Sequence, residues 1–135
     1  MWLAGGPSGS GKSTLFPISE TGLDHFNVDD RCAELNNGSY QGIPPAVRKR
    51  AGNECEAFVE EHIRKGKSFA VESTLRTTIA LEQAARANRR GFAVHLVYAC
   101  TDDVQINIER VRIRAAGGGH GAPASRIRET YTASL

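Results

Sequence analysis

Short apolar runs alternate with longer amphipathic stretches along this chain of 135 residues. Four of the runs have strand character, because they are brief, mainly apolar and followed by polar or glycine residues. They cover residues 1–4, 25–28, 68–74 and 93–99. The last run, AVHLVYA, is the one we expect to be most certainly buried, with His95 as a core histidine rather than a ligand.

Between these runs, apolar residues recur at spacings of three and four, which is the period of an amphipathic helix. The clearest helix is predicted over 46–65, and Gly66 ends it. Its apolar stripe consists of Val47, Ala51, Cys55, Phe58, Val59 and Ile63. Further helices are expected over 12–19, from 31 onward, from 77 or 78 to about 90, over 104–115 and over 125–131. Pro17 should interrupt the first of these helices, which we expect to end near Gly22.

The helix over 104–115 carries an unusual concentration of arginine. Val104, Ile108, Val111 and Ala115 form its predicted packed stripe, and Thr101, Asp102 and Asp103 supply its cap. The remaining faces carry Asn107, Glu109, Arg110, Arg112 and Arg114. Arg110 and Arg114 are four residues apart, so they share a face and can form a phosphate clamp, although an ordinary charged helix surface would look the same.

The alternation of strands and helices predicts an α/β fold, a three-layer α/β/α sandwich with a mostly parallel sheet and right-handed crossovers. Neither an internal repeat nor a second domain is visible, so residues 1–135 are expected to form one domain.

Composition excludes several classes of protein. Seventeen Lys and Arg against fifteen Asp and Glu leave a formal charge of +2, too balanced to indicate a nucleic-acid partner. Three separated cysteines, Cys32, Cys55 and Cys100, lack the spacing of a disulfide framework or a zinc site. No apolar run approaches the roughly 20 residues of a membrane span, and no signal sequence is visible. We therefore expect a soluble, cytoplasmic protein without a membrane partner.

The segment GGPSGSGKST, residues 5–14, contains the complete P-loop pattern for binding a nucleotide phosphate chain. Its glycines let backbone N–H groups turn toward phosphates, while Lys12 reaches the β- and γ-phosphates and Ser13 ligates Mg²⁺. The predicted nucleotide-binding residues are Gly6, Pro7, Ser8, Gly9, Ser10, Gly11, Lys12, Ser13 and Thr14. A flexible Gly/Ser-rich turn is the alternative, but it requires no Lys-Ser-Thr at a fixed position. The pattern predicts ATP and Mg²⁺ as ligands.

Polar residues follow two of the predicted strands. Asp29 and Asp30 come after 25–28, where they can cap the next helix, reach into a ligand cleft, or divide these roles. The segment 72–77, ESTLRT, ends the strand over 68–74, and parallel strands bring both ends to the same sheet edge. Asp29, Glu72 and Arg76 should therefore face the same cleft as the P-loop.

Glycine-rich residues 117–121 separate the arginine helix from the final basic helix. Two basic helices joined by a flexible hinge can form a lid over a triphosphate, and phosphoryl transfer to an alcohol requires that water be excluded. We expect this lid to cover about 110–128.

In their order along the chain, these segments resemble the zeta toxin family of P-loop kinases, which includes UDP-N-acetylglucosamine kinases and short bacterial predicted ATPases. The resemblance rests on GGPSGSGKSTL, FNVDD, SFAVESTLRT, IERVRIR and GGGHGAPASRIRETYTASL. It covers nearly the whole chain. It implies an ATP-dependent kinase that phosphorylates a hydroxyl of a small metabolite, with a nucleotide sugar as acceptor.

The resemblance also implies roles for individual residues. Asp29 matches the catalytic base, which leaves Asp30 as the expected helix cap, and Arg110 matches an arginine that neutralises the transferring phosphate. The implied substrate-binding residues are Glu56, Glu72, Thr74, Arg76 and His120. His120 lies nearest to a second lid arginine of the family, and Arg114 can supply that charge instead.

The family pattern further implies a strand beyond Leu135, so we expect a truncated C-terminus with a last strand missing. An antitoxin partner is implied by analogy alone. Two other functions stay open: a P-loop ATPase or kinase with a different acceptor, and a nucleotide-dependent binding module without acceptor chemistry.

Overall fold

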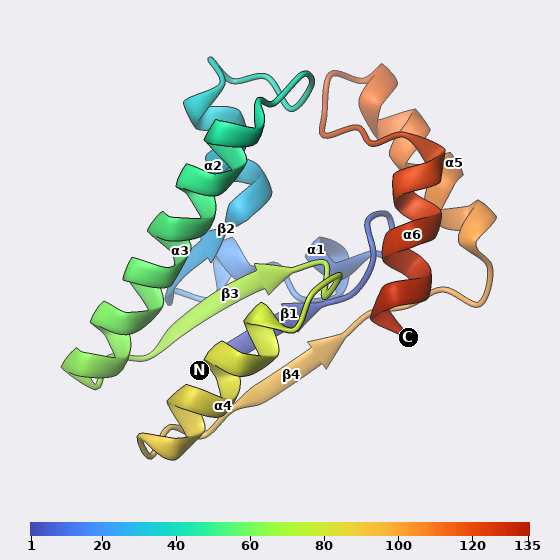
Figure 1. The fold of residues 1–135 in the computed structure, drawn as a ribbon. Coiled ribbons are helices and arrows are strands. Elements are labelled where there is room, and N and C mark those ends of the chain that lie inside the picture. The colour runs from blue at the N-terminus through green and yellow to red at the C-terminus, as the bar shows by residue number, and fades with distance from the viewer.

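The computed structural model describes residues 1–135 and contains one four-stranded parallel sheet (Figure 1). Its strands are β1 Trp2–Gly5, β2 Asp24–Asn27, β3 Phe69–Ser73 and β4 His95–Tyr98, in the spatial order β2-β3-β1-β4. In register, Leu3 of β1 lies opposite Val71 of β3 on one side and Leu96 of β4 on the other. The four predicted strands and the α/β fold are confirmed.

Helices cover the two faces of the sheet unequally. They are α1 Lys12–Leu15, the short 3-10 helix η1 Ile18–Glu20, α2 Val28–Leu35, α3 Pro45–Lys65, α4 Ile79–Arg89, α5 Val104–Ala116 and α6 Ala124–Ser134. On one face, α3 and α4 bury side chains such as Val59 and Ala84 against Leu3, Phe69 and Val71. On the other face, Phe16, which lies between α1 and η1, stacks on Trp2. None of the helices combines the length and apolar character needed to cross a bilayer.

The helix predicted over 12–19 is shorter than expected. It ends at Leu15, and Phe16 leaves the helical conformation with φ −140° and ψ 86°. Residue 16 precedes Pro17, whose ring disfavours helical geometry in the residue before it. The chain resumes as η1 and turns at Gly22, which has φ +72°.

The strand expected to be most certainly buried, β4, is instead an exposed edge of the sheet. Its only neighbour is β1, and Leu96 and Tyr98 are 52% and 39% exposed. His95 is also exposed and stacks on Trp2, with ring centroids 4.3 Å apart. Both predictions were wrong because composition does not reveal which strand lies at the edge.

Two arms rise beyond the carboxyl ends of the strands (Figure 1). One arm consists of α2 and the upper part of α3, held together by a small apolar cluster of Cys32, Ile43 and Ala51. The other consists of α5 and α6, which pack against each other. The sheet therefore places the P-loop, which follows β1, at the base of the space between the arms.

Candidate functional site

The P-loop adopts a backbone conformation that its glycines make accessible. Gly6, Gly9 and Gly11 have φ of +136°, +80° and +96°, values that residues with a Cβ rarely adopt. The loop closes through a hydrogen bond from the Ser10 N–H to the Pro7 carbonyl oxygen, 3.2 Å long. Gly11 then occupies the N-cap position of α1, and the helix continues with Lys12 and Ser13.

Lys12 is folded back into this loop. Its Nζ donates hydrogen bonds to the carbonyl oxygens of Gly6 and Pro7, at 2.8 and 3.1 Å, and lies 4.0 Å from a Glu72 carboxylate oxygen. Burial lowers the pKa of Lys12, while the Glu72 and Asp29 carboxylates oppose that shift. Burial likewise raises the pKa of Glu72, and Lys12 opposes the change. The lysine is thus a desolvated cation for which a phosphate chain would provide better compensation.

The residues present fit ATP and magnesium. The hydroxyl of Ser10 is buried without a hydrogen-bond partner inside the loop, as expected for a group that a bound anion would satisfy. Ser13 is exposed at the start of α1 and can contribute a hydroxyl to Mg²⁺. No group of three or more His, Cys, Asp or Glu forms an all-protein metal site. Magnesium in kinases is usually held by few side chains together with substrate phosphates, so this arrangement suits it.

Helix α5 packs directly on the P-loop. Asn107 is fully buried, and its amide nitrogen donates to the Ser8 carbonyl oxygen at 2.8 Å while its Oδ1 accepts from Thr101. The sequence had placed Asn107 on a polar face away from the packed stripe, which was wrong because the loop supplies a polar partner for it. One turn further, Arg110 Nη1 lies 3.4 Å from the Gly9 carbonyl oxygen. Arg110 is therefore held at the phosphate loop.

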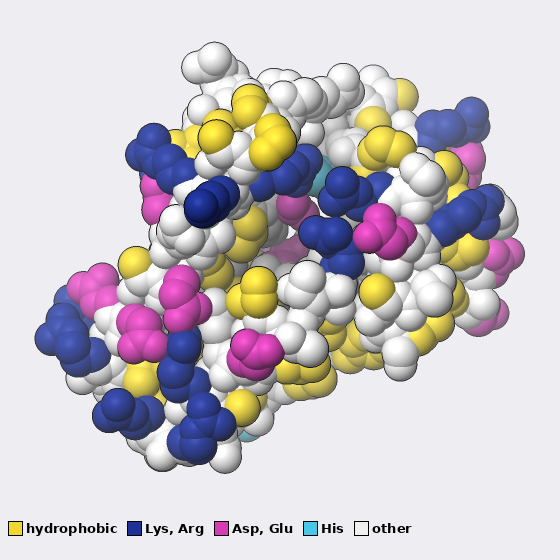
Figure 2. Space-filling model, viewed as in Figure 1, with side chains coloured by type: hydrophobic (Ala, Val, Ile, Leu, Met, Phe, Trp, Pro, Cys, Tyr) yellow, Lys and Arg dark blue, Asp and Glu magenta, His cyan; other side chains and the backbone are white.

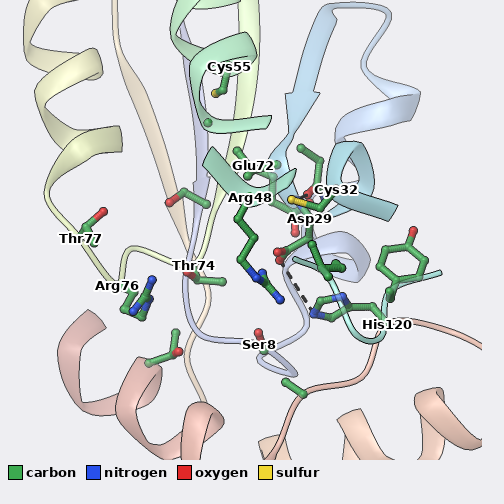
Figure 3. A pocket seen from close by; sticks show the side chains of 18 of the residues that line it. Ser8, Asp29, Cys32, Arg48, Cys55, Glu72, Thr74, Arg76, Thr77 and His120 are labelled. Atoms are coloured by element: carbon green, nitrogen blue, oxygen red, sulfur yellow. Dashed lines mark hydrogen bonds and ion pairs between the residues drawn. The ribbon is translucent and has the colours of Figure 1, made fainter. Parts of the chain in front are cut away.

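Asp29 and Asp30 lie in the first turn of α2, but neither caps it. The side chain of Asn27 accepts hydrogen bonds from the Asp29 and Asp30 N–H groups, at 2.9 and 3.3 Å. The expectation that Asp30 is the cap was wrong, because the helix begins one residue after Asn27. Asp30 instead accepts a hydrogen bond from the Tyr40 hydroxyl at 2.9 Å. The Asp29 carboxylate is left directed at the space between the arms (Figure 3).

The exit of β3 is held in a tight turn. The Ser73 hydroxyl accepts a hydrogen bond from the Leu75 N–H at 3.1 Å, and Leu75 has φ +54°, which is unusual for a residue with a side chain. Leu75 is anchored by burial in the core. The turn brings Thr74 and Arg76 to the same space as Asp29 (Figure 3). Thr78 occupies the N-cap position of α4, but its hydroxyl donates to the Glu82 side chain at 2.6 Å and accepts no hydrogen bond from the helix backbone.

The glycine segment between α5 and α6 brings His120 to Asp29. The His120 Nε2 lies 3.9 Å from the Asp29 carboxylate, and its ring meets the Tyr40 ring edge-on at 5.2 Å. Burial lowers the pKa of His120, and Asp29 opposes that shift. Arg114 fixes the segment, because its Nε donates to the His120 carbonyl oxygen at 2.9 Å. The lid expected over about 110–128 thus contacts the opposite arm.

A cavity of about 1290 Å³ occupies the space between the arms. Of the predicted residues, it is lined by Ser8, Asp29, Glu56, Glu72, Thr74, Arg76 and His120. The remaining P-loop residues, together with Arg110 and Arg114, do not line it. Figure 2 shows this hollow, with acidic atoms inside it and basic side chains around its rim. The structure therefore places the phosphate loop beside a cavity that Ser8 of the loop and Asp29 of α2 both line.

Glu56 borders the cavity, but its carboxylate is engaged elsewhere. It accepts hydrogen bonds from Gln83 at 2.8 Å and from Arg86 at 2.5 Å, which tie α3 to α4. Its predicted role toward substrate stays a prediction.

Several residues of the site were not predicted. Arg48, Lys49 and Arg126 line the cavity, and Tyr40 lies beside His120. Nothing in the local sequence distinguishes these residues from solvated surface residues, since their position depends on how the two arms face each other. Asn107 is the exception. It lies one helical turn before Arg110, so the spacing alone could have placed both residues on the same face of the helix.

Comparison with known proteins identifies the family. The sequence pattern of the family AAA_33, described as an AAA domain, matches residues 1–132. This chain belongs to that family. An uncharacterized protein of Haemophilus influenzae is 30% identical to this AAA_33 domain over 126 residues, which are 93% of this chain and 88% of that protein.

Solved structures share the fold of this AAA_33 domain. A chain of the Pnkp1/Rnl/Hen1 RNA repair complex superposes with a TM-score of 0.71 at 21% identity, covering 98% of this chain. This chain spans 42% of that one. A "putative kinase" from Chloroflexus aurantiacus superposes with a TM-score of 0.70 at 18% identity, covering 98% of this chain and 77% of its own. Family and P-loop together support a nucleotide-dependent kinase or ATPase.

Proposed function

We propose that this protein transfers the γ-phosphoryl group of ATP to a hydroxyl of a small metabolite, with a nucleotide sugar such as UDP-N-acetylglucosamine as acceptor. The observation that carries the proposal is the position of Asp29. Together with Ser8 of the P-loop, Asp29 lines a cavity large enough for such an acceptor. The choice of a nucleotide sugar rests on the resemblance to the zeta toxin family.

In this proposal, Asp29 accepts the proton of the acceptor hydroxyl while the oxygen attacks the γ-phosphorus. The bond from that phosphorus to the β,γ-bridging oxygen breaks, and ADP leaves. Lys12, already buried in the loop, neutralises charge on the phosphate chain. Arg110, held at the Gly9 carbonyl, and Arg114 add positive charge at the transferring group. When bound through Ser13, Mg²⁺ would supply further charge neutralisation.

The lid completes the site in this proposal. Transfer to an alcohol competes with transfer to water, so a kinase of this kind needs its acceptor cavity closed during reaction. The α5–α6 arm meets the opposite arm through His120, which contacts both Asp29 and Tyr40. Closing the arms further would sequester the hydroxyl and Asp29 from solvent.

The test is acceptor phosphorylation by the Asp29→Asn variant. The protein is incubated with ATP, Mg²⁺ and UDP-N-acetylglucosamine or a metabolite extract, and phosphorylated products are detected by mass spectrometry. Loss of the base should slow transfer by about 10²–10⁴-fold, whereas the neighbouring Asp30→Asn should transfer at nearly the parent rate. Undiminished transfer in Asp29→Asn would assign the base elsewhere. Release of free phosphate without product would favour an ATPase, and tight ATP binding without turnover would favour a binding module.

A further inference from the structure

The cavity between the arms carries positive charge that the protein itself does not neutralise. Four basic side chains line it, from Arg48, Lys49, Arg76 and Arg126. Arg48, Lys49 and Arg126 form no ion pair, and Arg76 has only Glu129, 3.5 Å away and 58% exposed. Unpaired arginines are common on open surfaces, where water solvates them. Here they surround one cavity.

The acidic residues of the cavity do not balance these cations. Glu72 is paired with Lys12 of the P-loop, and Glu56 is bound to Arg86 and Gln83. Asp29 is the remaining carboxylate, and it lies next to His120. A ligand that fills this cavity therefore meets an excess of positive charge.

The basic residues come from three separate parts of the fold. Arg48 and Lys49 lie on α3, Arg76 follows β3, and Arg126 lies in the first turn of α6. In Figure 3, Arg48 reaches toward Asp29 and His120, while Arg76 lies across the cavity beside Thr74. Guanidinium groups approaching from opposite arms can each donate two hydrogen bonds to one polyanion. A group with several anionic oxygens, such as phosphate, accepts donors from these different directions.

We propose that Arg48, Arg76 and Arg126 form a phosphate-binding subsite for the acceptor, so that the substrate is an alcohol that already carries a phosphate group. The inference rests on the proposed function, because it takes this cavity as the acceptor site. The subsite is separate from the nucleotide phosphates, since Lys12, Ser13 and Arg110 do not line the cavity. The acceptor hydroxyl lies at Asp29 and its phosphate lies toward the arginines.

The subsite can be tested by binding, without any turnover. The full chain is first saturated with Mg²⁺ and a non-hydrolysable ATP analogue, which occupies the P-loop. Inorganic pyrophosphate is then titrated in by calorimetry. Arg48→Gln and Arg126→Gln should each weaken its binding by about tenfold or more, because each removes charge-assisted hydrogen bonds. Arg50→Gln and Arg128→Gln are the matched controls, two residues along the same helices and outside the cavity.

Pyrophosphate that does not bind, or that binds equally to Arg126→Gln and Arg128→Gln, would overturn the subsite. Tighter binding of citrate than of pyrophosphate would overturn its assignment to phosphate. The proposed function is judged separately, by product formation. If a neutral alcohol were phosphorylated at the same rate by the parent and by Arg48→Gln, the proposed kinase function would stand and the phosphate subsite would be refuted. If pyrophosphate binding depended on these arginines but no phosphoryl transfer were detected, the subsite would stand and the proposed kinase function would be refuted.

Discussion

The Gly9→Ala substitution should disturb the close packing of the P-loop against α5. A Cβ at this residue would lie 2.5 Å from the Asn107 carbonyl oxygen and 3.0 Å from its Cα. Both are backbone atoms of a helix, so neither can rotate away, and the loop or the helix must move. The φ of +80° adds a second cost, of about 1–2 kcal/mol for a residue with a side chain.

Gly22 offers a matched control for the Gly9→Ala variant. Its φ is +72°, close to that of Gly9, but an added Cβ would have nothing within 4 Å. We expect Gly22→Ala to lose about 1–2 kcal/mol of unfolding free energy in urea. Gly9→Ala should lose a further 1–3 kcal/mol or so, as overpacked sites do.

Nucleotide affinity provides the second measurement of the Gly9 substitution. Displacing the loop by a few tenths of an ångström misaligns its N–H groups, so ATP binding measured by calorimetry should weaken by about tenfold or more, or 1.4 kcal/mol. Gly22→Ala should bind ATP as the parent does. If Gly9→Ala matched Gly22→Ala in both unfolding and affinity, the close packing of α5 on the loop would be refuted.

Three further predictions concern Phe69 in the core, the Asp24 carboxylate at the start of β2, and the buried amide of Asn107. Phe69→Ala should reduce the unfolding free energy by about 3–5 kcal/mol in urea titrations, because Phe69 is fully buried, whereas Leu15→Ala, 69% exposed, should change it little. Asp24 has its pKa lowered to about 2 by hydrogen bonds from Lys67 and then His62. Its contribution to stability is therefore present above pH 4 and lost as the pH falls from about 4 toward 2. Urea unfolding midpoints measured over this pH range should fall less in Asp24→Asn than in the parent protein. Asn107→Ala should lower the unfolding free energy in urea by about 1–3 kcal/mol, because it removes the hydrogen bond to the part-buried Ser8 carbonyl, and parent-like stability would contradict that reading.

Local patterns predicted most of the fold because the residues that define them are close in sequence. The P-loop needs its glycines and Lys12 at fixed spacing, and α3 ends at Gly66, whose φ of +65° suits glycine. The first helix was predicted too long because Pro17 was expected to be tolerated within it, whereas the helix ends at Leu15, before the proline. Burial of β4 depended on its place in the sheet, which one strand's composition does not encode.

The candidate site was predicted in part for the same reason. Asp29, Thr74 and Arg76 follow strands, so a parallel sheet brings them to one edge whatever the rest of the chain does. Arg48 and Arg126 reach the cavity only because the two arms face each other. Their sequence neighbours Arg50 and Arg128 look alike in pattern and lie outside it.

One face of α5 connects the two halves of the site. Asn107, Arg110 and Arg114 recur at spacings of three and four, so they lie along one side of the helix. They contact, in order, the Ser8 carbonyl, the Gly9 carbonyl and the His120 carbonyl, and His120 in turn meets Asp29. One side of α5 therefore contacts both the phosphate loop and the segment that holds His120 beside Asp29.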